Sequence, residues 1–244
     1  IASTPPMGPV YVCLPQDVLD AVVTEEVYPT SHVSTRVTPA PETVAVMADL
    51  LLAGKKPMIF AGDGVAYSDA QHELEKVAEL LGAEVWEADA GEVNIRYDHP
   101  LYMGMTGHMF GSSSLPIMQK GDVILVVGTY LLPEVFPELG AIFAPGAKVV
   151  HIDLNAYEIA KNHPVDLGVA ADPKLTLGLL AAALTDRAKF DHTAAVAHRS
   201  AEIGESKRAK RATQLEADKA ALGATPLKMA EFMAALAAKL RAAR

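Results

Sequence analysis

Gly62-Asp63-Gly64 follows an apolar run and precedes a helical pattern, so these residues have the types and the place that can bind a phosphate. Glycines at a turn from a strand to a helix let a phosphate approach backbone N–H groups at the start of the helix. A complete dinucleotide-binding pattern needs a further glycine where Tyr67 stands, whereas Glu87 lies near the expected position of a ribose-binding acid. The motif therefore indicates either a nucleotide site or a tight turn in which glycine only permits a positive φ.

A longer glycine-rich segment, residues 102–114, ends where a helix is expected to begin. A loop of this length in a compact domain is commonly functional, so it could hold a diphosphate or lie against a flavin, or it could pack against a neighbouring subunit. Asp153 and Asp172 stand at or just beyond predicted strand ends, where a carboxylate can accept hydrogen bonds from a ribose or an adenine. Each could equally cap the segment that follows it.

The sequence lacks the residue patterns of a metal site, a hydrolase site and a P-loop site. The eight histidines have no metal-ligand spacing and Cys13 has no partner cysteine, so we expect no metal site. The serines at 112–114 do not complete the nucleophile elbow of a hydrolase. Gly54-Lys55-Lys56 lacks the upstream glycine and the following Ser or Thr of a Walker loop, which excludes a P-loop site.

Alternating strands and helices must position the candidate residues. Continuous apolar runs predict strands at residues 57–61, 84–88, 122–127, 148–153 and 166–170. Helical spacing predicts helices at residues 41–53, 68–81, 111–119 and 173–184. Parallel strands need crossover connections and both faces of such a sheet must be covered. The chain is therefore predicted to be an α/β protein with a doubly wound parallel sheet, Rossmann-like, in three layers α/β/α.

The two ends of the chain differ from this regular part. An apolar strand is expected at residues 10–14, and residues 16–40 read as an extended connector because they lack any period. Beyond Arg187 the composition predicts a solvated helical tail, in which the basic cluster at residues 206–211 is a charged face rather than a site for an acidic partner. Thr225 and Pro226 are expected to begin a last amphipathic helix as N-cap and N1.

Composition narrows the class of protein. Half of the 244 residues are apolar, and no apolar run reaches the length of a membrane helix. The formal charge of −9 argues against a nucleic acid partner, and a single cysteine excludes an intramolecular disulfide framework. We expect a soluble cytoplasmic protein that binds neither nucleic acid nor a membrane.

The order of several segments resembles a known enzyme family. Residues 8–18, with Gly8-Pro9-Val10 before an apolar strand and Pro15 after it, resemble the last strand of the pyrimidine-binding domain in thiamine-diphosphate-dependent enzymes. Those enzymes include 2-oxo-acid decarboxylases, acetolactate synthases and relatives of benzoylformate decarboxylase. Six further segments resemble the central domain of the same family, in sequence order: residues 56–64, 78–83, 99–105, 121–128, 143–148 and 152–159. The resemblance covers residues 8–184 and implies the family's NAD/FAD-binding type of central fold.

The resemblance divides the chain into four parts. Residues 1–24 would be the terminal strand of a truncated pyrimidine-binding domain and residues 25–40 a linker. Residues 41–187 would be the central domain, and residues 188–244 a helical tail that leads to an absent diphosphate-binding domain. In the family, thiamine diphosphate and magnesium lie between the two flanking domains. We therefore expect no catalytic residue and no metal ligand here, and reject Asp63 as a magnesium ligand because no paired asparagines follow it.

The family also suggests which residues of a central domain touch a cofactor. Acetolactate-synthase-like members bind FAD there, some oxalyl-CoA decarboxylase relatives bind an adenine nucleotide, and many simple decarboxylases bind nothing. The positions that match are Gly62, Gly64, Gly104, Met105, Thr106, Gly107, Gly128, Asp153 and Asp172. Where flavin-binding members place an arginine, this sequence has Thr129-Tyr130-Leu131, which weakens the case for FAD.

The resemblance implies a function for the parent enzyme. It would decarboxylate or carboligate 2-oxo acids as a lyase or transferase, with thiamine diphosphate as electron sink, and would be a homodimer or homotetramer. A stand-alone domain that binds FAD, ADP or CoA, or a structural domain that promotes oligomerisation, is the alternative.

Overall fold

The computed structural model describes residues 2, 4, 7–29, 33–88, 90–132 and 134–242. Within these residues one parallel sheet has the strand order β3-β2-β1-β4-β5-β6. Its strands are β1 (Pro57–Ala61), β2 (Glu84–Glu87), β3 (Tyr102–Met105), β4 (Val123–Val127), β5 (Lys148–Asp153) and β6 (Leu167–Ala170). This is the order of a doubly wound nucleotide-binding fold, so the predicted fold class is confirmed.

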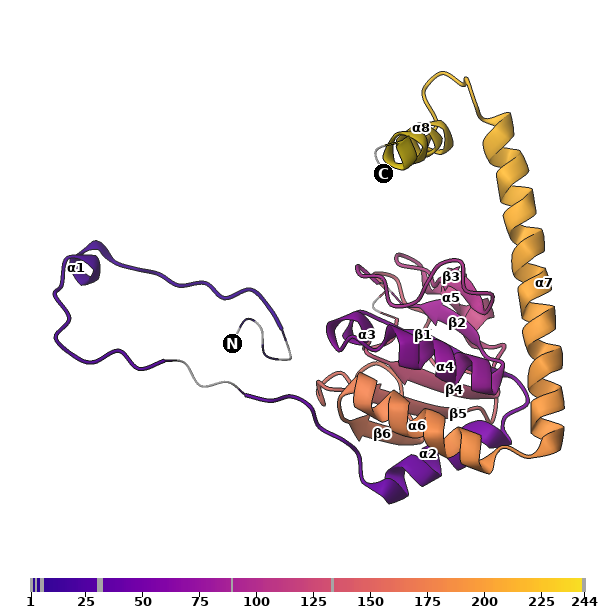
Figure 1. The fold of residues 1–244 in the computed structure, drawn as a ribbon, viewed down its shortest axis with the longest axis horizontal. Helices are drawn as coiled ribbons and strands as arrows, with labels where there is room; N and C mark the ends of the chain where they lie inside the picture. Colours follow the sequence, from indigo (N-terminus) through magenta and orange to yellow (C-terminus); the bar gives the residue numbers. More distant parts are fainter. Residues whose placement is uncertain are drawn as a thin grey trace.

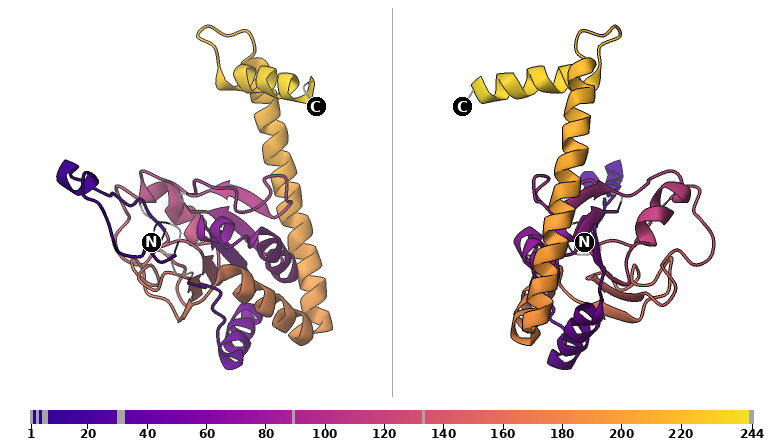
Figure 2. Two further views of the ribbon diagram at one scale, coloured as in Figure 1. Left: turned by 60° about the vertical axis from the view of Figure 1, so that its left-hand side comes forward. Right: turned by 90° about the vertical axis from the view of Figure 1, so that its right-hand side faces the viewer.

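Helices cover one face of the sheet, and a helix with irregular chain covers the other (Figure 2). α2 (Pro41–Ala53), α4 (Gln71–Leu81) and α6 (Pro173–Arg187) pack together over the first face. α5 (Gly111–Met118) and the segment that carries Leu131, Leu132 and Ile142 cover the second. β1 and β4 are buried along their whole length because both faces are covered, which explains their continuous apolar sequences.

The two central strands end in turns that touch each other. A Cβ atom added to Gly64 would lie 2.6 Å from the Cα of Gly128, and Gly128 itself has φ +67. The Gly64 N–H donates a hydrogen bond to the Gly128 carbonyl at 3.0 Å. Only glycines allow this approach of backbone to backbone, so they fix how closely the ends of β1 and β4 lie together.

Two elements near these turns differ from the prediction. The helix expected from residue 68 begins at Gln71, because α3 (Gly64–Tyr67) forms a separate turn and Asp69 has a left-handed φ of 57°. Strand β3 lies inside the segment that was expected to be a loop, and it pairs with β2 through a shifted register. As a half-exposed edge strand with Gly104 inside it, β3 lacks the continuous apolar run of a central strand.

No strand forms at residues 10–14 within the described part of the chain, so the assignment of this segment to a flanking domain stays a prediction. These residues are exposed and have no strand hydrogen bonds, and the segment runs out from the sheet in Figure 1. A strand requires a neighbouring strand to accept and donate its backbone hydrogen bonds, and the described residues offer none to this segment. The connector that follows is mostly extended, as expected, except for the short helix α1 (Gln16–Leu19).

The C-terminal part is helical, as predicted. α7 (Phe190–Ala220) runs past the edge of the sheet and beyond it, and α8 (Met229–Ala242) follows near its far end (Figure 1). On the inner side of α7, the Lys207 ammonium donates hydrogen bonds to the carbonyls of Tyr97 and His99 at 2.7 and 2.6 Å. The predicted cap is wrong, because α8 begins three residues after Pro226 rather than at it. None of the helices in the described part is both long and apolar enough to cross a membrane.

The contact between the two turns predicts that Gly64→Ala lowers the free energy of unfolding by about 1–3 kcal/mol, the usual cost of an overpacked site. Gly178→Ala is the matched control, because an added Cβ there meets nothing nearer than 4.0 Å and lies within α6. It should raise stability by about 0.5–1 kcal/mol through helix propensity. Urea unfolding monitored by circular dichroism measures both. A Gly64→Ala variant as stable as the unaltered chain would contradict the close approach.

Candidate functional site

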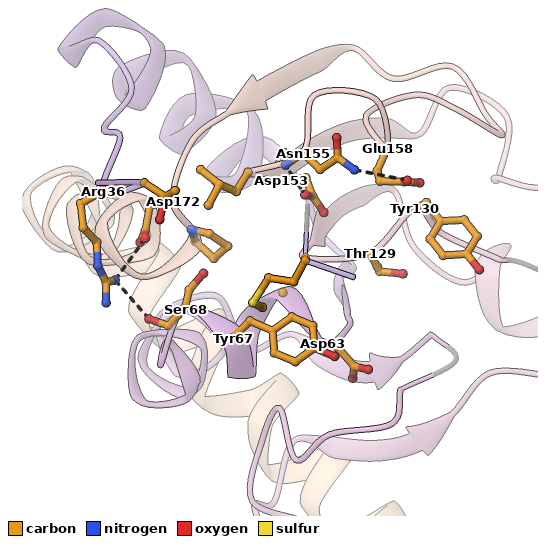
Figure 3. A pocket seen from close by; sticks show the side chains of 16 residues that line it. Arg36, Asp63, Tyr67, Ser68, Thr129, Tyr130, Asp153, Asn155, Glu158 and Asp172 are labelled. Atoms are coloured by element: carbon orange, nitrogen blue, oxygen red, sulfur yellow. Dashed lines mark hydrogen bonds and ion pairs between the residues drawn. The ribbon is translucent and has the colours of Figure 1, made fainter. Parts of the chain in front are cut away.

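A cavity of about 370 Å3 lies at the carboxyl ends of the central strands. Its walls come from the ends of β1, β4 and β5 and from the start of α6, together with Met7, Thr35 and Arg36 of the N-terminal segment (Figure 3). The strand order reverses between β1 and β4. Ligands of doubly wound folds bind in the crevice at this point, so the cavity, called the crevice below, is the candidate site.

The structure brings together some of the residues that the sequence indicated. Gly64, Gly128, Asp153 and Asp172 line the crevice. Gly62 does not line the crevice but packs against Thr129, which does, because a Cβ added to Gly62 would be 2.5 Å from the Cβ of Thr129. These positions share one edge because the carboxyl ends of parallel strands meet there.

The segment from Gly104 to Gly107 does not line the crevice. Gly104 and Met105 lie on the edge strand β3, separated from β1 by β2. The Thr106 N–H donates to the Glu87 carbonyl at 2.8 Å, and the Gly107 N–H donates to the Ser114 hydroxyl at 2.9 Å. These contacts give the segment a structural role, and a cofactor contact there stays a prediction.

Two acids near the first turn form internal hydrogen bonds. The Asp63 carboxylate accepts backbone N–H groups of Gly91 and Glu92 at 3.0 Å and the Asn94 amide at 3.3 Å, which holds the loop after β2. Glu87, the candidate ribose ligand, is fully buried and accepts the Tyr102 hydroxyl at 2.7 Å. Glu87 is thus part of a buried network and does not line the crevice.

Asp153 is one of two buried acids of the crevice, the other being Asp172. Asp153 ends β5 with only 9% of its surface exposed, and its Oδ1 accepts the Asn155 N–H at 2.7 Å. Burial raises the pKa of its carboxyl to about 6, because the charged form loses solvation, and the nearby charge of Glu158 adds to the rise. A carboxyl with this pKa changes its charge near neutral pH.

Asp172 and Arg36 connect the crevice to the N-terminal segment. Asp172 is the N-cap of α6, since its Oδ1 accepts the Leu175 N–H at 3.0 Å, as the capping interpretation predicts. Its Oδ2 lies 3.1 Å from Nη1 of Arg36, which also donates to the Ser68 carbonyl at 3.2 Å. Sequence reasoning missed Arg36, because nothing in an aperiodic connector indicates where a side chain will dock.

The charges around the crevice do not fit a diphosphate. Among the described residues that line it, four are carboxylates and Arg36 is the one lysine or arginine. Arg36 is already paired with Asp172. Lys161 lies close by but is paired with Glu158 at 3.2 Å. A phosphate placed here would meet fixed negative charge without a free cation to balance it.

Nor do the described residues offer a metal centre. No group of three or more His, Cys, Asp or Glu side chains in this part of the chain is arranged to hold an ion. Asp63, which stands in a motif similar to a magnesium-binding one, uses its carboxylate to hold the loop at residues 91–94. The group therefore has a structural function.

Comparisons with known proteins agree with this architecture. Residues 44–180 match the family described as "Thiamine pyrophosphate enzyme, central domain". The "Probable acetolactate synthase large subunit" of Methanocaldococcus jannaschii is 34% identical over 190 residues, which are 75% of this chain and 32% of that protein. Benzoylformate decarboxylase from Polynucleobacter necessarius superposes with a TM-score of 0.63 at 29% identity, over 74% of this chain and 34% of that one. The chain thus spans about a third of the length of the relatives that it matches.

The raised pKa of Asp153 predicts how stability changes with pH. Between about pH 4 and pH 6 the folded chain binds this proton and the unfolded chain releases it, so burial of the charged form lowers stability as pH rises. Asp153→Asn removes this cost. Its unfolding free energy, relative to the unaltered chain, should therefore rise by about 2–3 kcal/mol across that interval. Urea unfolding at a series of pH values measures the difference.

Asp166→Asn is the control with the opposite sign. The hydrogen bond from Lys148 lowers the pKa of the Asp166 carboxyl, so this group stabilises the fold above its unfolded pKa and loses that effect as pH falls. The Asp166 variant should therefore lose stability relative to the unaltered chain as pH rises. A difference for Asp153→Asn that does not depend on pH would contradict the burial of its charge.

Proposed function

Because the chain belongs to the thiamine pyrophosphate enzyme family and matches its central domain, we propose that it forms the middle part of an enzyme that decarboxylates or carboligates 2-oxo acids. The match over residues 44–180 is the observation that carries the proposal. The names of its relatives, acetolactate synthase and benzoylformate decarboxylase, support the same two kinds of reaction. The enzyme would use thiamine diphosphate and magnesium, and would act as a lyase or a transferase.

In this enzyme the chain has a positioning role. Bound thiamine diphosphate supplies an electron sink for the carbanion that remains when carbon dioxide leaves the substrate. The described residues do not fit that cofactor or its metal, because the acids at the carboxyl edge are engaged in internal contacts. Asp63 holds the loop after β2, and Asp172 caps α6. The domain would therefore act as a rigid spacer between the parts that bind the cofactor.

The way the N-terminal segment docks supports this role. Arg36 is held by Asp172 and by the Ser68 carbonyl, and the Asp172 N–H donates to the Val37 carbonyl at 2.8 Å. These contacts anchor the connector directly on the edge of the sheet. The linker at residues 25–40 would thereby hold residues 1–24, the terminal strand of a truncated pyrimidine-binding domain, at a fixed position relative to the central domain at residues 41–187.

Exposed apolar side chains support the proposal that the chain contacts further domains or subunits. Val12 and Val22 of the N-terminal segment and Phe232 of α8 are more than half exposed. Such surfaces are typically buried against another domain or subunit. We therefore propose that residues 188–244 lead to a diphosphate-binding domain and that the enzyme is a homodimer or homotetramer. We also propose that the enzyme is cytoplasmic. FAD or ADP in the crevice is the less favoured addition, because the lining is acidic.

Activity measurements on two proteins test the proposal. The product of the whole reading frame that encodes this chain should release carbon dioxide from pyruvate or benzoylformate when thiamine diphosphate and magnesium are present. Removal of magnesium with EDTA should abolish the activity. The isolated 244-residue chain should show none under the same conditions, because none of its described residues fit the cofactor. Turnover by the isolated chain above the protein-free background, or activity of the whole product without thiamine diphosphate, would refute the assignment.

A further inference from the structure

A buried histidine connects two segments that border the crevice. His151 lies within β5 with 2% of its surface exposed. Its side chain points to the second face of the sheet, because its neighbours Val150 and Ile152 belong to the core of the first face. There His151 contacts the turn after β4 and a segment beyond β5, residues 155–162, called the wall segment below.

These two contacts fix the protonation state of the ring. Nε2 of His151 lies 2.8 Å from the Thr129 carbonyl, which accepts hydrogen bonds, so Nε2 carries a proton. The Ala160 N–H lies 3.3 Å from Nδ1 and donates to it, so Nδ1 carries none. The ring is therefore neutral while both contacts exist. A second proton would bind at Nδ1, oppose the Ala160 N–H and break that hydrogen bond.

The wall segment needs the support that His151 gives. Ala160 has a left-handed φ of 57°, which alanine disfavours, so contacts must hold it in this conformation. A second contact comes from the Asn162 amide, which donates to the carbonyls of Tyr130 and Leu131 at 3.3 and 3.0 Å. Loss of the His151 contact would remove one of these supports from a disfavoured backbone conformation.

Burial opposes protonation of the ring as long as the wall segment stays in place. It lowers the pKa of His151 because the charged form loses solvation, whereas the hydrogen bond to Thr129 and the charge of Glu158 act in the opposite direction. An imidazole released into solvent has its ordinary pKa of about 6.5. The released form therefore takes up a proton below that pH, and the stability of the bound form relative to it is lost as pH falls.

Other ionisable groups near His151 must be taken into account. The residues of β4 and β6 that pair with His151 are uncharged, and α5 carries no charged residue. The charged and titratable side chains of the remaining segments on this face include Glu134, Glu138, Asp153, Glu158, Lys161 and His163. Asp153, with a pKa of about 6, titrates in the same range. It opposes His151, because a release that exposes Asp153 becomes more favourable as pH rises.

We propose that His151 is a pH-sensitive switch: the neutral ring holds the wall segment against the turn after β4, and protonation of the ring releases the segment and opens the crevice. Asn155 and Glu158 belong to the wall segment and line the crevice (Figure 3), so its release changes that wall. The proposal concerns this chain and does not depend on the reaction of the whole enzyme.

Hydrogen exchange of the full chain, measured by mass spectrometry, tests the switch. The background is Asp153→Asn, which removes the opposing titration. Protection of peptides that contain Ala160, relative to peptides from β4 and corrected for the intrinsic rate, should fall about 10- to 30-fold from pH 7.5 to pH 5.0. Adding His151→Asn should abolish this dependence, because an amide oxygen can accept the Ala160 N–H and does not titrate. Protection independent of pH in the first variant, or an equal fall in the second, would overturn the proposal.

His163→Asn in the same background is the matched control. Burial also lowers the pKa of His163, which follows the wall segment directly, but its ring packs edge-on against Phe143 at 6.1 Å between centroids. This variant should keep the pH dependence, and its loss here would assign the switch to His163 and refute the role of His151. Circular dichroism verifies that each variant is folded.

Nitrogen NMR of the His151 ring tests the same proposal without a substitution at that position. At pH 7 the ring should carry a proton on Nε2 alone, and the protection at Ala160 should fall as the ring takes up its second proton. A doubly protonated ring at pH 5 beside an Ala160 amide that is still protected would contradict the switch.

Discussion

The contact between Gly64 and Gly128 is the constraint on which the carboxyl edge of the sheet depends. The turns that end β1 and β4 meet backbone to backbone, with an N–H of one bonded to a carbonyl of the other. The strand order continues from β1 to β2 and β3 on one side and from β4 to β5 and β6 on the other, and this reversal of the order leaves a crevice between β1 and β4. Asp153 is the last residue of β5, and Asp63 and Asp172 each come two residues after a strand, so all three lie at the carboxyl edge of the sheet.

Most acids at this edge are engaged in stabilising the fold. Asp63 holds the loop after β2, Asp172 caps α6 and holds Arg36, and Glu87 lies in a buried network with Tyr102. Asp153 differs, because burial raises the pKa of its carboxyl to about 6 while the group still borders the crevice. A scaffold that uses its polar groups in this way suits a domain that positions its neighbours, and it leaves a crevice whose charge opposes phosphate binding.

The sequence predicted the elements that depend on local contacts or on the spacing of apolar residues. β1 and β4 were recognisable because strands buried on both faces are continuously apolar, and Asp172 was recognisable as a cap because it precedes Pro173 at the first turn of α6. β3 was missed because an edge strand needs fewer apolar residues. The N-terminal strand does not form among the described residues, since a strand depends on a partner strand that the local sequence cannot supply. Arg36 could not be found, because its position results from tertiary hydrogen bonds of an aperiodic connector.

The central claim is that the contact between the central turns creates a crevice in which burial raises the pKa of Asp153. Carboxyl carbon NMR of the chain, with the Asp153 signal assigned by its loss in Asp153→Asn, measures the titration of that group directly. The account predicts a pKa of about 6. A titration midpoint at or below about 4, the ordinary value for aspartate, would contradict it.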